Sequence, residues 1–314
     1  MTGSDILCFG EPLMEFAEVE RGGERLMLPG FGGDTMNVAV AAARQGARVE
    51  VFTALGDDAF GQDFLDLWDR EGITRDRVIR RTDAGTGLYF ITYSPEGHVF
   101  SYARAGSAAS RVGPDDVPHD RIRATRALHV SGISQAISQS ACDAVFASLR
   151  TAKEAGVLVS YDTNLRLKLW PLDRARAVIH ESLRLADIAR PGLDDARLLT
   201  GLDTPDEVAD YYLSLGPSIV ALTLGAEGCL VATRTERRRV PGIKVAAVDA
   251  SGAGDTFGGA FLAQYLTSGD PFAAARHANV AAALQTQGRG AVAPMPRRDE
   301  VLAALARAGQ ETTR

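Results

Sequence analysis

Residues 249–261, DASGAGDTFGGAF, combine small side chains with one carboxylate in a way that suits phosphoryl transfer. Gly252, Ala253 and Gly254 directly precede Asp255, and a small, apolar run follows. A helix that begins near Asp255 leaves its first amides without partners, and the helix dipole makes that end attract an anion. Small residues let a phosphate come close to those amides.

A carboxylate repels a bound phosphate, so Asp255 requires its own explanation. In phosphoryl transfer, a base takes the proton of the accepting hydroxyl while amides stabilise charge on the transferring group. We therefore assign Asp255 as the general base and the amides of Gly252, Ala253 and Gly254 as an anion hole. The alternative is that Asp255 only caps the helix. No Lys-Ser or Lys-Thr pair follows, so the stretch is not a Walker loop.

The rest of the chain alternates short apolar runs with segments of helical period. In residues 57–72, Phe60, Phe64, Leu67 and Trp68 form one helical stripe. Six runs are typical of buried strands: 5–10, 47–56, 127–133, 156–162, 186–191 and 218–225. This alternation predicts an α/β fold with a mostly parallel central sheet covered on both faces.

Two segments interrupt this rhythm, residues 12–32 and 87–106. The first suggests a strand pair around Gly22 and Gly23, and the second has two alternating runs joined at residues 95–97. We interpret these four strands as a small β-sheet lid inserted into a single domain of residues 1–314. Because no helix follows these strands, one face stays bare, and we expect a homo-oligomer, either a dimer through the lid or a larger assembly.

Composition limits the classes of partner. The chain has 314 residues and a net charge of −6, so nothing indicates a nucleic-acid or membrane-surface partner. No apolar run is long enough to span a bilayer, and no histidines have metal-binding spacing. The three cysteines lie far apart, which indicates buried thiols in a reducing compartment and hence a cytoplasmic protein.

Residues 249–261, 29–47 and 220–231 resemble the signature stretches of the ribokinase-like (PfkB) carbohydrate kinases, in the family's order and spacing. The resemblance covers essentially the whole chain and implies a three-layer α/β sandwich with a β lid. It also implies transfer of the γ-phosphate of ATP to a sugar hydroxyl, with Asp255 as the base. One departure is Ala250, where the family usually has Thr. The family positions around the nucleotide correspond here to Thr223, Gly225, Gly228 and Asn279.

The acceptor is suggested first by charged and aromatic residues. Tyr102 and Arg104 alternate on one predicted lid strand, Tyr89 lies on its partner, and Arg166 follows a strand end, where ligands of α/β sheets bind. Two arginines aimed at one pocket suggest a carboxylate on the acceptor, because guanidinium binds carboxylate through a planar fork. The alternative is that both arginines lie on the surface.

Within the family, the stretches GEPLMEF, GLYFITY, YARAGSAAS and DTNLRLKLW resemble 2-keto-3-deoxygluconate kinases. The implied reaction converts ATP and 2-keto-3-deoxy-D-gluconate to ADP and the 6-phosphate, a step of Entner–Doudoroff-type and uronate catabolism. The galactonate epimer, fructose and ribose remain alternative acceptors, and a non-catalytic sugar- or nucleotide-binding regulator is a further alternative. The implied acceptor contacts are Gly33, Asn37, Tyr89, Tyr102, Arg104 and Arg166.

Magnesium must accompany ATP, because it neutralises phosphate oxygens during transfer. The family often has Asn-x-x-Glu near the metal's water shell; here residues 192–195 run from Gly192 to Asp195, so Asp195 is the candidate. Some relatives bind a monovalent cation such as K⁺ beside residues equivalent to Asp249 and the loop 287–294. The resemblance extends that expectation to this chain.

Overall fold

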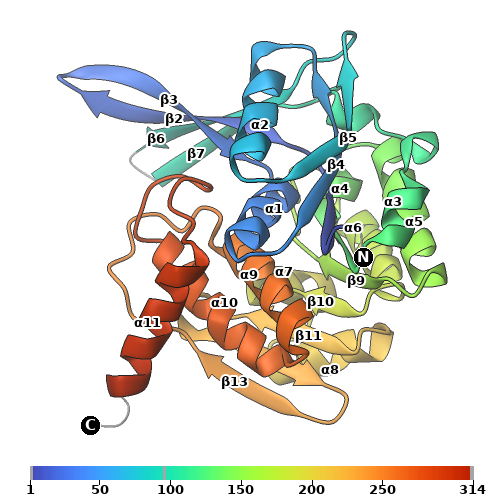
Figure 1. Cartoon of the computed structure of the whole chain (residues 1–314), viewed down its shortest axis with the longest axis vertical. Helices are drawn as coiled ribbons and strands as arrows, with labels where there is room; N and C mark the ends of the chain where they lie inside the picture. The colour runs from blue at the N-terminus through green and yellow to red at the C-terminus, as the bar shows by residue number, and fades with distance from the viewer. Residues whose placement is uncertain (1–2, 95–96, 312–314) are drawn as a thin grey trace.

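The computed structural model describes residues 3–94 and 97–311, so the turn predicted at 95–97 falls mostly outside them (Figure 1). The chain forms two sheets, one of nine strands and one of four. In the large sheet the order is β13-β12-β11-β10-β9-β8-β1-β4-β5. Its strands are β1 Ile6–Phe9, β4 Val49–Gly56, β5 Thr74–Arg81, β8 Ala127–Ser131, β9 Leu158–Asp162, β10 Ile188–Arg190, β11 Ile219–Thr223, β12 Gly228–Thr233 and β13 Arg237–Pro241.

All six predicted central strands form, and they pair in parallel, which confirms the predicted α/β sheet. The antiparallel pairings in this sheet, β11 with β12 and β12 with β13, lie at one edge. The opposite edge, β5, was not predicted as a strand. Its sequence TRDRVIRR carries four arginines that are partly or fully exposed, as an unpaired sheet edge tends to do, and it lacks the apolar run that marks the buried strands.

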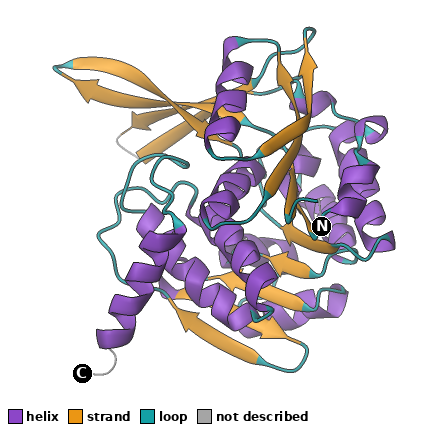
Figure 2. Ribbon diagram, viewed as in Figure 1, coloured by secondary structure: helices purple, strands orange, loops and turns teal. Residues whose placement is uncertain are grey.

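Helices cover both faces of the large sheet, which gives the three layers of the predicted sandwich (Figure 2). Alternate side chains of β1 show the division: Ile6 and Cys8 pack in one core, and Leu7 and Phe9 in the other. The first layer contains α1 Asp34–Arg44, α2 Ala59–Arg70, α9 Ala253–Ser268, α10 Pro271–Gln285 and α11 Arg298–Glu311. The second contains α3 His119–Ala124, α5 Gln139–Glu154, α6 Leu172–Leu183, α7 Leu193–Thr200 and α8 Pro205–Leu215. Within the described residues, no helix is long and apolar enough to cross a membrane.

The predicted lid is the four-stranded sheet β3-β2-β6-β7, which projects from the main body (Figure 1). Its strands are β2 Leu13–Arg21, β3 Glu24–Gly32, β6 Gly87–Ser94 and β7 Gly97–Ala103. Gly22 and Gly23 both have positive φ, 61° and 83°, and close the β2–β3 hairpin. The expectation that no helix covers the lid is wrong at its base, where Phe16 packs on Phe60 of α2 with ring centroids 5.7 Å apart.

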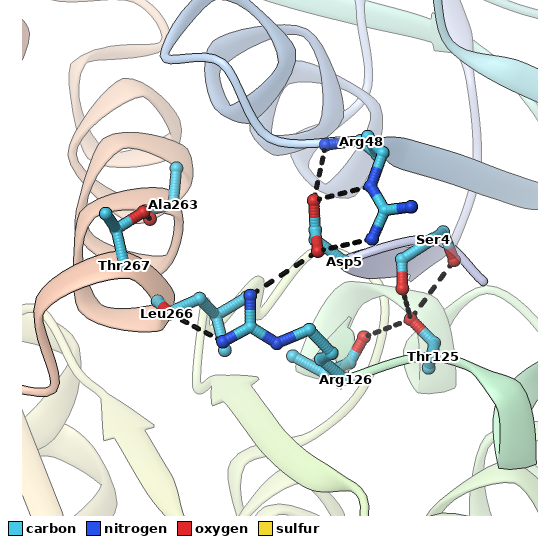
Figure 3. Close-up of polar contacts among 9 residues, drawn as sticks. Ser4, Asp5, Arg48, Thr125, Arg126, Ala263, Leu266 and Thr267 are labelled. Carbon is cyan, nitrogen blue, oxygen red and sulfur yellow. Dashed lines mark hydrogen bonds and ion pairs between the residues drawn. The ribbon is translucent and has the colours of Figure 1, made fainter. Parts of the chain in front are cut away.

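Helix α9 is held firmly in the first layer. A Cβ on Gly259 would lie 2.5 Å from the carbonyl oxygen of Val38, so α9 and α1 touch through a glycine. Near the C-terminal end of α9, Arg126 donates from Nη2 to the carbonyl oxygen of Leu266 at 2.6 Å (Figure 3). Arg126 also reaches Asp5, which forms an ion pair with Arg48, so the start of β1 is tied to α9. The opposite end of α9 carries Asp255.

Candidate active site

Asp255 lies in the first turn of α9, because that helix begins at Ala253, earlier than predicted. Its N-cap is Gly252, whose φ of 79° is left-handed and suits glycine. Asp255 Oδ2 accepts a hydrogen bond from Nδ2 of Asn37 at 2.8 Å and caps no helix amide. The capping alternative is therefore wrong, and Asp255 is available to a ligand in the pocket that it lines.

The predicted anion hole has fewer free amides than the sequence suggested. The amide of Ala253 donates to the carbonyl oxygen of Ala250 at 3.1 Å, so it is already engaged. The amides of Gly252 and Gly254 have no partner among the described residues. A Cβ on Gly254 would meet nothing within 4 Å, so that position opens directly onto free space. Of the three predicted amides, those of Gly252 and Gly254 are therefore free to face an anion.

Asp255 lies in a buried cluster of charged groups. The pKa of Asp255 is raised to about 7, mainly by burial and also by the negative charges of Asp34 and Asp162. The hydrogen bond from Asn37 and the positive charge of Arg190 oppose that rise in pKa. A carboxyl group with a pKa near neutrality can take up a proton and release it again at physiological pH, which suits a general base.

Arg190 was not predicted as a site residue. It is 4% exposed; its Nη2 donates to the carbonyl oxygen of Gly254 at 2.8 Å and lies 3.2 Å from Oδ2 of Asp162. A Cβ on Gly258 would lie 1.9 Å from Nη1 of Arg190, so the guanidinium fits against α9 only because that position is glycine. A charged residue at the end of a buried strand, directly before Pro191, was the available signal.

A cavity of about 430 Å³ lies between the lid and the N-terminal end of α9. Asp255 lines it, together with residues from the lid, from α1 and from the loop after β9. The six predicted acceptor residues all line it: Gly33, Asn37, Tyr89, Tyr102, Arg104 and Arg166. The sequence reasoning missed Glu11, Asp34, Asn164 and Lys168, which line it too.

Two predicted contacts have protein partners. Arg104 donates from Nη2 to Oε2 of Glu11, and both side chains are largely buried. Tyr89 donates its hydroxyl to Glu15, so it presents mainly its ring to the cavity. The charge of Arg104 is therefore neutralised by Glu11 inside the pocket. The prediction that Arg104 and Arg166 both offer a free guanidinium to the acceptor needs revision for Arg104.

The loop after β9 supplies positive charge that is less neutralised by protein carboxylates than the charge of Arg104. The side chain of Arg166 is 50% exposed, and its nearest carboxylate, Asp195, is 3.9 Å away. Lys168 is exposed, with no ion pair among the described residues, and its position two residues after Arg166 was the signal for it. Asn164 shapes this loop: it has a φ of 27° and donates from Nδ2 to Asp34 at 3.1 Å. A positive φ in a residue other than glycine is a conformation often found at functional sites.

The predicted nucleotide residues gather at the β11–β12 connection. Thr223 ends β11, and Gly225 and Gly228 have φ values of 61° and 102°, so both glycines are required by the turn itself. Asn279 is buried and donates from Nδ2 to the carbonyl oxygens of Val240 and Pro241, at 2.9 and 3.2 Å. The hydrogen-bond acceptors of the Asn279 side-chain NH2 group are therefore main-chain carbonyl oxygens. Its Oδ1 atom alone remains available to accept a hydrogen bond from adenine.

The predicted metal residues are hydrogen-bonded to the main chain. Asp195 Oδ2 accepts from the amide of Leu165 at 2.9 Å, and burial raises its pKa. Asp249 accepts from the amides of Ser251 and Gly290, at 2.8 and 2.9 Å. Within the described residues, no group of three or more His, Cys, Asp or Glu side chains could hold a metal ion.

A buried carboxylate beside free helix amides, at a pocket on a three-layer α/β sandwich, is the arrangement expected of a phosphotransferase of the ribokinase-like class. The family model for "pfkB family carbohydrate kinase" matches residues 4–298. The chain belongs to that family and is an ATP-dependent sugar kinase.

Three comparisons indicate the breadth of the family around this chain. It is 35% identical to 2-dehydro-3-deoxygluconokinase of Bacillus subtilis, over 96% of this chain and 95% of that protein. It is 34% identical to the protein named "Probable fructokinase-4" of Arabidopsis thaliana, over 96% of each. A crystal structure of a candidate ribokinase II from E. coli, in complex with ATP and Mg²⁺, matches with a TM-score of 0.90 and 25% identity, over 97% of this chain and 99% of that one.

Proposed function

We propose that this kinase phosphorylates the 6-hydroxyl of 2-keto-3-deoxy-D-gluconate. The observation that carries the proposal is the pair Arg166 and Lys168, exposed in the pocket that Asp255 lines. A half-exposed guanidinium whose nearest carboxylate is 3.9 Å away, beside an ammonium with no ion pair among the described residues, suits an acceptor that carries its own carboxylate. The similarity to 2-dehydro-3-deoxygluconokinases supports the same acceptor.

The reaction requires one proton transfer and one phosphoryl transfer. Asp255 takes the proton of the acceptor hydroxyl, and the hydroxyl oxygen forms a bond to the γ-phosphorus as the bond to the β,γ-bridging oxygen breaks. The amides of Gly252 and Gly254 hold the charge that develops on the transferring group. Magnesium bound to ATP neutralises phosphate charge, and we assign Asp195 to its water shell.

Fructose is the alternative acceptor, since a fructokinase relative is nearly as similar in sequence. The deciding experiment measures ADP release with Mg-ATP and five acceptors: 2-keto-3-deoxygluconate, its galactonate epimer, gluconate, fructose and ribose. We expect kcat/KM for the keto-deoxy acids to exceed that for neutral sugars by about a hundredfold or more, the size of a well-formed charged contact. Higher kcat/KM with fructose or ribose would leave the kinase class intact and overturn the acceptor.

Arg166→Ala tests the carboxylate contact directly. It should raise KM for the keto-deoxy acid about tenfold or more while leaving activity on a neutral sugar unchanged, because only the acid offers a partner to the guanidinium. Arg174→Ala, on the exposed surface of α6, is the matched control. Equal losses on acidic and neutral acceptors would show that Arg166 shapes the loop and does not bind a carboxylate.

A further inference from the structure

Two loops meet behind the anion hole, and the same two side chains clamp both. Asp249 accepts hydrogen bonds from the amides of Ser251 and Gly290. Gln285 donates from Nε2 to the carbonyl oxygens of the same two residues, at 2.5 and 3.2 Å. One side chain thus takes both N–H groups and the other takes both C=O groups.

The contacts of Asp249 and Gln285 with Ser251 and Gly290 affect phosphate binding directly, because Ser251 is next to Gly252, whose amide belongs to the anion hole. A Cβ on Gly252 would lie 2.9 Å from the carbonyl oxygen of Ala291, so the two loops are already in contact there. Any shift of Ser251 relative to Gly290 would move the amide of Gly252. The position of the anion hole therefore depends on how these two loops are joined.

Converging carbonyl oxygens concentrate negative potential and need a positive partner, either a cation or an N–H donor. Gln285 is 0% exposed and supplies that donor from inside the protein. Its Oε1 is buried without a hydrogen-bond partner among the described residues. Leaving an amide oxygen unsatisfied costs free energy, so the contacts of Nε2 must offset that cost.

We propose that the Gln285 amide takes the place of the monovalent cation that the family resemblance led us to expect beside Asp249, so that this kinase positions its anion hole without such an ion. The residues present do not fit a cation: the carboxylate of Asp249 receives two N–H groups, and two carbonyl oxygens beside it face an amide nitrogen. The inference depends on the kinase class and not on which sugar is the acceptor.

The wild-type enzyme gives the first test. ADP is quantified by chromatography, so that no coupling enzyme responds to salt, with ATP and buffer as tetramethylammonium salts. Adding KCl or NaCl at constant ionic strength should change kcat by less than about twofold, because the donor is part of the chain. Activation of tenfold or more by K⁺ would overturn the proposal.

Two substitutions of Gln285 then distinguish the role of its N–H donor from the role of its side-chain volume. Gln285→Ala leaves room and two unpaired carbonyl oxygens, so kcat should fall about tenfold to a hundredfold and KCl should restore much of it. Gln285→Leu keeps the volume without the donor, so kcat should fall and K⁺ should not restore it. Gln62→Ala, an exposed glutamine on α2 that contacts Asp66, is the control and should behave as wild type. Full activity of Gln285→Ala without alkali cations would overturn the proposal.

A stability measurement keeps the test decisive if catalysis is lost altogether. Melting temperatures in tetramethylammonium and potassium chloride need no substrate. Gln285→Ala should gain stability specifically with K⁺, because only that variant exposes an empty cation position. Wild type and Gln285→Leu should melt equally in both salts. A K⁺-dependent rise in the melting temperature of wild type would contradict the proposal.

Discussion

At the scale of residues, Asp255 accepts a hydrogen bond from Asn37, and burial together with its charged neighbours brings its pKa to about 7. Asp255→Asn preserves the shape and the contact with Asn37 but removes the base. We expect kcat to fall by about 10²–10⁴, the usual contribution of general-base catalysis, while ATP still binds. Steady-state kinetics and nucleotide titration check this. A loss below tenfold would mean that Asp255 is not the base.

The charged neighbours of Asp255 lead to a second prediction, about the pH dependence of kcat/KM. Because the proposed base must be ionised to accept a proton, kcat/KM should rise with pH through about 7, the pKa of Asp255. The charge of Asp34 raises this pKa, so Asp34→Asn should shift the inflection to lower pH.

Asp63→Asn, an exposed position on α2, is the control and should leave the inflection unmoved. An unchanged inflection in Asp34→Asn, with activity still measurable, would show that the profile reports a different group.

The sequence alone predicted those site residues whose type and spacing form a recognisable motif. It singled out Asp255, Asn37 and Arg166, and the structure brings all three to one pocket. It missed Glu11, which pairs with Arg104, and Arg190, which lies under α9, because the roles of both depend on partners that are distant in the sequence. Their partners come from distant parts of the chain, and only the fold sets those distances.

At the scale of elements, α9 connects the site to the far end of the sheet. Arg190 contacts its first turn, and Arg126 contacts its last turns beside Asp5. The predicted start of α9 was late because small residues give no apolar period, and the left-handed Gly252 marks the true boundary. The sequence predicts central strands better than such boundaries because buried runs persist over several residues.

Asp5 allows a test of this far end. The hydrogen bond from Arg48 is the main cause that lowers the pKa of Asp5, to about 2. Because the folded pKa is depressed, its contribution to stability is present above about pH 4 and is lost as pH falls towards 2. Asp5→Asn should therefore lower the melting temperature by about 2 °C at pH 7 and by less at pH 3.

Scanning calorimetry of both proteins at the two pH values checks this. Asp173→Asn, on the exposed start of α6, is the control. An equal difference between Asp5→Asn and wild type at both pH values would rule out the ionised carboxylate as its cause.

At the scale of the whole molecule, one lid face remains open. Leu26 and Leu28 are each 41% exposed and Tyr102 is 44% exposed, and the strand register places them on the face that carries Tyr89. Exposed apolar side chains on one face of a sheet favour association. We expect a dimer or larger assembly through this face.

Sedimentation measures that association. Leu26→Glu should reduce the mass to that of a monomer, because a charge would have to be buried at the contact. Leu302→Glu, at a similarly exposed leucine of α11, should leave the mass unchanged. A wild-type monomer at micromolar concentration would exclude assembly through the lid.

Gly258 and Gly259 sit back to back on α9, one against the guanidinium of Arg190 and the other against the main chain of α1. A single added methyl group would overlap a neighbour on either side. In a library of all single substitutions these two adjacent positions should tolerate almost nothing, whereas Gly254, which faces open space, should accept alanine in the folded protein. Tolerance to substitution along one short helix would then distinguish positions that assemble the molecule from a position reserved for its ligand.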